Sequence, residues 1–209
     1  MSLIVGVDLA QANDYTAVVV SERVDGPSSK EDTFHIRHIE RLPLHMAYPR
    51  QATHIGRLLD RLDTDAQLVV DATGVGKPVV DLLRDSGLKL VAATITAGEA
   101  VTREGGDYRV PKATLVAEVQ VLLQTSRLKI AKDLDLAEQL VNELLAFKVS
   151  INERGHARFG NDVGQWRQGD HDDLVLATAL AVWWGRRATG YTSHRVPKRE
   201  AGAHRSGRR

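Results

Sequence analysis

The sequence predicts an α/β fold with one mixed sheet, in which three antiparallel strands come first, parallel strands follow, and helices cover the faces. Two observations lead to this prediction. Three strand-like stretches lie within residues 3–42, and the chain then alternates between helix-like and strand-like stretches. Crossover connections of that kind pair strands in parallel, so the later strands extend the first meander into a mixed sheet.

The first three strands are predicted over residues 3–8, 15–23 and 33–42. These stretches are rich in β-branched and other apolar residues. The small, turn-forming segment AQAND connects the first two, and the cluster DGPSSKED precedes the third. Such short connections predict antiparallel pairing between strands that follow one another along the chain.

The middle of the chain alternates between helix and strand. Apolar residues recur at helical spacing over residues 55–62, and residues 67–71 follow as a short buried strand. A second helix begins near Pro78, which suits the first turn of a helix, and ends near Gly87. The next strand is predicted over residues 88–95.

The last part of the chain begins with glycines and charges that follow no clear period, and we predict a mobile loop over residues 96–112. Pro111 then opens a helix. The remaining elements are predicted as helices over residues 113–126, 133–147 and 172–187, a short strand over 127–130, and a hairpin of strands 147–151 and 157–159.

Composition narrows the class of protein. A chain of 209 residues with 43% hydrophobic residues suits one domain with its own core. The absence of cysteine excludes disulfides, thiolate zinc sites and cysteine nucleophiles. No apolar run is long enough to span a bilayer and the first residues lack the pattern of a signal peptide. We therefore expect an intracellular protein that does not interact with a membrane.

Charge is distributed unevenly along the chain. From Gly185 to the end there are eight Lys and Arg residues against one acidic residue, whereas the preceding part carries an excess of acids. Gly, Ser and Pro punctuate this stretch, and no apolar period continues beyond Trp184. We therefore predict one domain over residues 1–188 and a basic, disordered tail over residues 189–209 that is suited to a polyanion.

Three acidic positions, far apart in the sequence, stand where a hydrophobic element meets a loop. Asp8 ends the first strand, Asp71 ends the strand over residues 67–71, and Asp172 and Asp173 precede the last helix. Burying carboxylates in apolar surroundings is costly unless their charge is compensated. Since oxygen ligands of this type suit Mg²⁺ or Mn²⁺ rather than zinc, the pattern predicts a divalent metal site made by these acids.

Strand and helix periodicity indicate where the acidic side chains point. Asp8 shares a strand face with Gly6, and Asp71 lies beyond the carboxyl end of a parallel strand, where ligand sites form in such sheets. Asp173 shares a helical face with Trp184 and is expected to point toward the core, which favours it over its neighbour as a ligand. One Asp suffices to cap a helix, and the sequence leaves both members of the pair open as ligands.

These motifs resemble the ribonuclease H-like nuclease domain of the large terminase subunit of tailed phages. The resemblance rests on a first strand that ends in Asp, on DATG after a second strand, and on HDD before an alanine-rich helix. It includes YRVPKATLVAEVQVLLQTSRLKI, which is similar to the Lys-led helix and short strand of those domains. It extends over most of residues 3–185 and implies a ribonuclease H-like sheet with helices on both faces.

The resemblance implies an endonuclease that cuts double-stranded DNA during genome packaging by hydrolysing phosphodiester bonds with two Mg²⁺ or Mn²⁺ ions. By motif, Asp8, Asp71 and one or both of Asp172 and Asp173 would bind the metals and carry the catalysis. The neighbouring His171 would either protonate the leaving group or be an ordinary residue at a helix start. The family also implies a motor ATPase, a portal and a small terminase subunit as partners, in the cytoplasm of the host cell.

The sequence departs from full-length terminases because it carries no motor signature. The segment ATGVGKP does not fit the phosphate-loop pattern, since Asp71 stands in place of the first Gly and Pro78 in place of the Ser or Thr that binds Mg²⁺. We therefore expect a nuclease domain that is cut from, or encoded separately from, a longer motor protein.

Candidate DNA contacts are Arg103, Arg109 and Lys112, which lie on the predicted loop and at the start of the helix that follows it. Lys and Arg side chains at these positions would bind phosphates without reading the base sequence. These residues and the basic tail are the predicted DNA-binding elements.

Three alternative functions are compatible with parts of this pattern: a junction-resolving nuclease of the same fold, an actin-like phosphotransferase, and a catalytically inactive DNA-binding or assembly module. The chain is too short for the two domains of an actin-like enzyme. Cleavage of linear compared with branched DNA distinguishes the two nucleases. Divalent-dependent cleavage distinguishes either of them from an inactive module.

Overall fold

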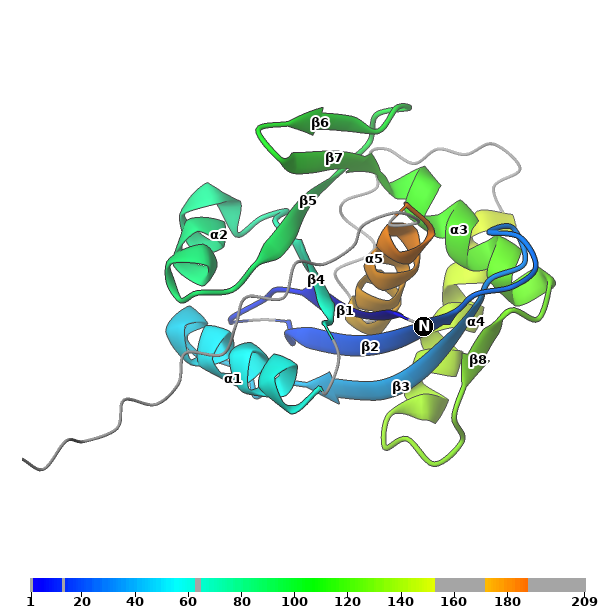
Figure 1. The fold of residues 1–209 in the computed structure, drawn as a ribbon, viewed down its shortest axis with the longest axis horizontal. Coiled ribbons are helices and arrows are strands. Elements are labelled where there is room, and N and C mark those ends of the chain that lie inside the picture. Colours follow the sequence, from blue (N-terminus) through cyan, green and yellow to red (C-terminus); the bar gives the residue numbers. More distant parts are fainter. Residues whose placement is uncertain (1, 13, 63–64, 153–171, 188–209) are drawn as a thin grey trace, which may run out of the picture.

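A computed structural model describes residues 2–12, 14–62, 65–152 and 172–187. In this part of the chain one eight-stranded sheet has the strand order β6-β7-β5-β4-β1-β2-β3-β8 (Figure 1). The strands are β1 (Ser2–Asp8), β2 (Ala17–Val24), β3 (Thr33–Arg41), β4 (Gln67–Asp71), β5 (Leu90–Thr96), β6 (Thr102–Glu104), β7 (Asp107–Pro111) and β8 (Leu128–Ile130). The helices are α1 (Tyr48–Arg61), α2 (Gly76–Asp85), α3 (Lys112–Gln124), α4 (Ala137–Asn152) and α5 (Asp173–Arg187).

The order and direction of the strands confirm the predicted mixed sheet. Strands β1, β2 and β3 form an antiparallel meander. Strand β4 pairs with β1 in parallel, β5 with β4, and β7 with β5, while β8 pairs in parallel with β3 at the other side. Within this sheet only β2 and β6 run against the other strands, so the carboxyl ends of β1, β3 and β4 lie at one edge.

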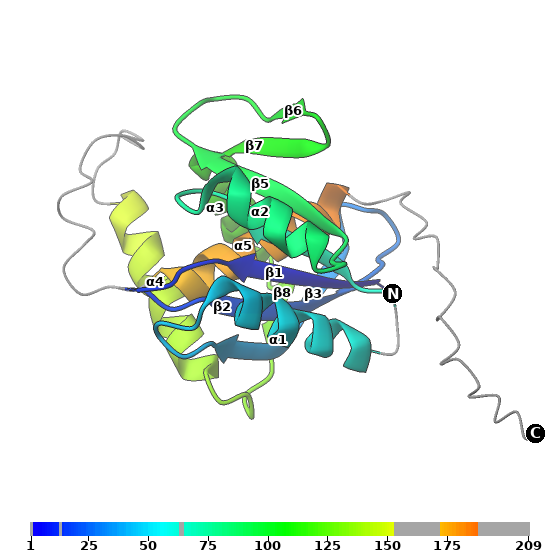
Figure 2. The same ribbon diagram turned by 90° about the vertical axis from the view of Figure 1, so that its left-hand side faces the viewer.

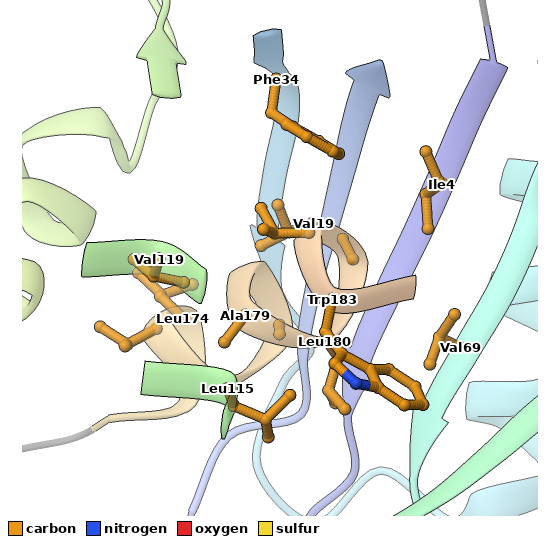
Figure 3. Close-up of a cluster of buried hydrophobic side chains, with 14 of the residues drawn as sticks. Ile4, Val19, Phe34, Val69, Leu115, Val119, Leu174, Ala179, Leu180 and Trp183 are labelled. Carbon is orange, nitrogen blue, oxygen red and sulfur yellow. The ribbon is translucent and has the colours of Figure 1, made fainter. Parts of the chain in front are cut away.

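A hydrophobic core lies on each face of the sheet, as predicted for an α/β fold with helices on both faces. On one face, Ile4 and Val69 pack with Trp183 of α5, and α3 and α4 complete this layer (Figure 3). On the other face, Val5 of β1 packs with Ile55 of α1, and α2 lies beside α1 (Figure 2). Both tryptophans of α5 are core residues. None of the described helices is long and apolar enough to cross a membrane.

Helix α5 lies directly on β1 because Gly6 has no side chain. A Cβ atom built on Gly6 would lie 2.0 Å from the carbonyl oxygen of Ala177 and 3.0 Å from the backbone nitrogen of Ala181. Near the other end of the helix, a Cβ on Gly185 would lie 2.6 Å from the ring of Phe34, at the start of β3. Helix α5 therefore runs antiparallel to β1, and its first residues reach the edge where β1 ends.

The prediction of a mobile loop over residues 96–112 is wrong, because most of this segment forms the antiparallel hairpin β6-β7. Gly105 and Gly106 close the hairpin with φ angles of 59° and 100°. Glycine adopts positive φ without strain, and positive φ at both positions suits a two-residue hairpin turn. Tyr108 also packs edge-on against both tryptophans of α5, with 5.5 Å between ring centroids.

The predicted hairpin of strands 147–151 and 157–159 is wrong in its first strand, because α4 continues through that segment. Leu140 and Leu144 are buried one helical turn apart, so the helical period is already established before the predicted strand. The second predicted strand, His171 and the predicted basic tail lie outside the described residues.

We predict that Gly6→Ala destabilises the fold by at least about 1–3 kcal/mol, because its Cβ would press on the backbone of α5. Gly56→Ala is the matched control. A Cβ at Gly56 of α1 would meet only the Leu88 side chain, at 3.6 Å. Replacing glycine by alanine inside a helix stabilises by about 0.5–1 kcal/mol. Urea unfolding of both variants checks the prediction, and a Gly6→Ala protein as stable as the wild type contradicts the direct seating of α5 on β1.

Candidate metal centre

Asp8 and Asp71 end two neighbouring parallel strands at the centre of the sheet. Val7 of β1 pairs with Val70 of β4, so the residues that follow them stand side by side. Strand alternation places both carboxylates on the face covered by α5, because Val69 belongs to that core and Val70 to the opposite one.

The start of α5 brings the acidic pair to the same edge of the sheet. Asp172 precedes the helix and Asp173 is its first residue. Both are close enough to Asp8 for their charges to raise its pKa, and the charge of Asp172 also raises the pKa of Asp71. Asp71, Asp172 and Asp173 therefore gather around Asp8, although the four acids come from three distant parts of the chain.

Burial makes the two strand-end acids reluctant to ionise. Burial raises the pKa of Asp8 well above its usual range, and the charges of Asp71, Asp172, Asp173 and Asp14 raise it further. Burial also raises the pKa of Asp71 to about 6, against the opposing effects of hydrogen bonds from Thr73 and of the charge on Lys112. One of these bonds runs from the backbone N–H of Thr73 to Oδ1 of Asp71 at 2.7 Å. A divalent cation would supply the positive charge that lets Asp8 and Asp71 ionise.

The chemistry of this donor set fits Mg²⁺ or Mn²⁺, which take carboxylate oxygens as ligands. Among the described residues, no three acidic or histidine side chains already surround a common point at ligand distance. Repulsion between like charges keeps carboxylates apart until a cation compensates them. The cluster is therefore a set of candidate ligands that a cation would draw together.

Lys112, the first residue of α3, lies beside the acids. Its Nζ is 3.4 Å from Oδ2 of Asp172, and its charge lowers the pKa of Asp71. Of the three predicted DNA-binding residues, this is the one that contacts the acidic cluster.

Arg103 and Arg109 lie on the β6-β7 hairpin, and both are exposed. Arg103 pairs with Tyr108 across the hairpin, and its guanidinium lies over the tyrosine ring at 5.5 Å from the centroid. Arg103 is therefore on the side of the sheet that carries α5. Arg109 follows Tyr108 directly in β7, so its side chain points to the opposite face. A ligand that engages both arginines must pass around the edge of the hairpin.

The sequence analysis missed Arg41, which binds Asp173, and Glu143, which binds Arg41. Arg41, at the end of β3, donates hydrogen bonds from Nε and Nη2 to the two carboxylate oxygens of Asp173 at 2.7 and 2.6 Å. Its Nη2 also donates to Oε1 of Glu143 in α4 at 2.7 Å. Burial raises the pKa of Glu143 to about 7, with the charge of Asp173 adding to the effect and Arg41 opposing it.

No sequence signal identifies this arrangement. An Arg at the end of a strand is usual, and its partner Asp173 is 132 residues away in the chain. The expectation that a buried carboxylate at position 173 needs a partner could have prompted a search for a basic residue, but nothing in the sequence distinguishes Arg41 from the other arginines.

Comparisons with known proteins find a matching family model and solved structures of similar fold. The family model described as the terminase RNaseH-like domain matches residues 5–183. The large terminase nuclease from thermophilic phage G20c, solved with bound magnesium, matches with a TM-score of 0.55 and 21% identity, over 87% of this chain and 80% of that chain. The g2p (large terminase) nuclease domain from bacteriophage SPP1, solved with bound Mn, matches with a TM-score of 0.50 and 12% identity, over 87% of this chain and 85% of that chain. The curated proteins include no match.

Without divalent ions, we predict that the free energy of unfolding falls as the pH rises from about 4 to about 7. The raised pKa values of Asp8 and Asp71 mean that the folded state keeps protons which the unfolded chain has released, so rising pH favours the unfolded state. Asp8→Asn should therefore flatten this slope and raise the free energy of unfolding at pH 7 in EDTA, because asparagine keeps the size of the side chain and removes its charge. Urea unfolding across this pH range measures both effects.

The control for this prediction is Asp60→Asn, at an exposed position of α1, which should leave the slope unchanged. An Asp8→Asn protein that is less stable than the wild type at pH 7 in EDTA contradicts the prediction.

Proposed function

The chain belongs to the terminase RNaseH-like domain family, and on that premise we propose that it is a metal-dependent endonuclease that cuts double-stranded DNA. The observation that carries the proposal is the gathering of Asp71, Asp172 and Asp173 around Asp8 at the carboxyl edge of parallel strands. Buried carboxylates with too little compensating charge are typical of sites that hold divalent ions for phosphoryl chemistry.

We assign the metal ligands from their places in the cluster. Asp8, at its centre, would hold both of two Mg²⁺ or Mn²⁺ ions, Asp71 one of them, and the Asp172 and Asp173 pair the other. When bound, such ions lower the pKa of an attacking water and stabilise the charge that develops on the phosphate oxygens. The two phage nuclease structures contain bound magnesium and manganese, which supports the same choice of ions here.

The residues around the acids would orient them and bind DNA. The backbone N–H of Thr73 holds one oxygen of Asp71, and its hydroxyl oxygen accepts a hydrogen bond from Ile95 at 2.7 Å, which fixes the loop after β4. Lys112, whose Nζ is 3.4 Å from Asp172, would bind a phosphate at the cluster. Arg103 and Arg109 on the hairpin would bind the DNA backbone without reading sequence.

Family membership also supports a role in phage genome packaging, in the cytoplasm of the host cell. The partners that we propose are a motor ATPase domain, a portal and a small terminase subunit. The basic segment 189–209 would add a sequence-independent attachment to DNA.

Asp8→Asn and Asp71→Asn should each reduce nicking of plasmid DNA in Mn²⁺ or Mg²⁺ to background, because each change removes a charge from the metal centre without altering size. Agarose gels of plasmid conversion measure nicking, and circular dichroism checks that the fold is intact. Asp60→Asn is the matched control and should cut like the wild type. Undiminished cutting by the Asp8 and Asp71 variants would exclude this centre as the nuclease site.

Lys112→Ala should weaken DNA binding uniformly across sequences and reduce the slope of log affinity against log salt by about 1, as expected for the loss of one phosphate contact. Fluorescence anisotropy with duplex DNA measures the slope, in an Asp8→Asn background so that the DNA stays intact. Lys89→Ala is the control, because Lys89 is exposed and precedes β5 at the edge opposite the acids. Equal slopes for the two variants would contradict a phosphate contact by Lys112.

A further inference from the structure

Helix α5 is held at both ends by arginines from neighbouring strands. Near its C-terminal end, Arg23 of β2 donates a hydrogen bond from Nη1 to the carbonyl oxygen of Gly185 at 2.7 Å. At its first residue, Arg41 of β3 holds Asp173 with a two-pronged pair of hydrogen bonds. Because the two strands are antiparallel, one arginine reaches each end of the helix.

The pair between Arg41 and Asp173 is enclosed. The side chains are 11% and 5% exposed, and the guanidinium lies over the ring of Tyr15 at 5.2 Å. Glu143 accepts a further hydrogen bond from the same guanidinium and is likewise 11% exposed. Breaking a buried ion pair with two hydrogen bonds is costly, so Asp173 can leave Arg41 for a metal only at a high cost, although Glu143 stays bound to the guanidinium.

Asp172 is in a different environment, although it is the adjacent residue. Its side chain is 35% exposed and meets Lys112 at 3.4 Å, a longer and more exposed contact than that of Asp173 with Arg41. A carboxylate with a single contact of this length to a lysine can turn toward an ion. A carboxylate in a bidentate pair with an arginine is held in one orientation.

The position of Arg41 in the sheet links its pairing with Asp173 to the metal centre. Arg41 pairs with Ala17 of β2, and Ala17 pairs with Asp8 of β1, so Arg41 and Asp8 stand in one row across three strands. By holding Asp173 from this row, Arg41 fixes where α5 begins relative to Asp8. Asp172, which immediately precedes the helix, is thereby held at the edge of the sheet where Asp8 and Asp71 lie.

We propose that Arg41 is a positioning residue that engages Asp173 as the anchor of α5, so that Asp172 is the third carboxylate of the metal centre. This inference rests on the proposed function, and it reverses the sequence analysis, which favoured Asp173 over Asp172 as the metal ligand. Glu143 supports the arrangement, since its hydrogen bond to Arg41 would keep the guanidinium in place in an Asp173→Asn variant.

Calorimetric titration of the protein with Mn²⁺, in the absence of DNA, tests this division of roles. Asp172→Asn and Asp8→Asn should each weaken Mn²⁺ binding at least about tenfold, whereas Asp173→Asn should stay within a few-fold of the wild type but unfold at a lower temperature. Arg41→Met should weaken Mn²⁺ binding about tenfold by releasing the start of α5. The Mn²⁺ affinity of Arg41→Lys should lie between those of the wild type and Arg41→Met, because lysine keeps the charge but not the bidentate geometry.

Arg23→Met is the matched control, because Arg23 holds the far end of the same helix. It should lower the melting temperature without changing Mn²⁺ affinity, which separates positioning of the acids from general stabilisation of α5. Loss of Mn²⁺ affinity in Asp173→Asn as large as in Asp172→Asn overturns the proposal, as does wild-type affinity in Arg41→Met. A wild-type protein that neither binds Mn²⁺ nor cuts DNA overturns the proposed function itself, which is a different result.

Discussion

The direct contact between Gly6 and the backbone of α5 is the constraint on which the rest of the site depends. A side chain at position 6 would collide with Ala177, so only glycine lets the helix lie this close to β1. Because α5 runs antiparallel to β1, this contact delivers the start of the helix to the end of the strand. Arg23 and Arg41 then fix the helix lengthwise, and acids distant in sequence meet at one edge of the sheet.

The hydrophobic scaffold that gathers the acids also makes their charges unfavourable. Two apolar cores surround the central strands, and burial raises the pKa of Asp8 and of Asp71. Only one of the acids is paired with a buried arginine, and Lys112 makes a longer contact with another. In the proposed function, a divalent ion supplies the missing charge. Metal binding would therefore offset the free energy that the fold loses by burying these carboxylates together.

Much of the fold and of the candidate site follows from local patterns in the sequence. The alternation in β1 and β4 places Asp8 and Asp71 on the correct face, and the apolar face of α5 identifies Asp173 as buried. The β6-β7 hairpin was missed because its strands are short, although two adjacent glycines marked its turn. The pairing of Arg41 with Asp173 cannot be read from the sequence, because it depends on which strand end lies beside the start of α5.

The central claim is that these remote acids jointly bind divalent ions, and a crystal of the protein soaked in Mn²⁺ tests it most directly. The account predicts anomalous difference peaks in contact with Asp8, Asp71 and Asp172, with Asp173 still bound to Arg41. Anomalous peaks only at other places, with these carboxylates left without metal, would contradict it.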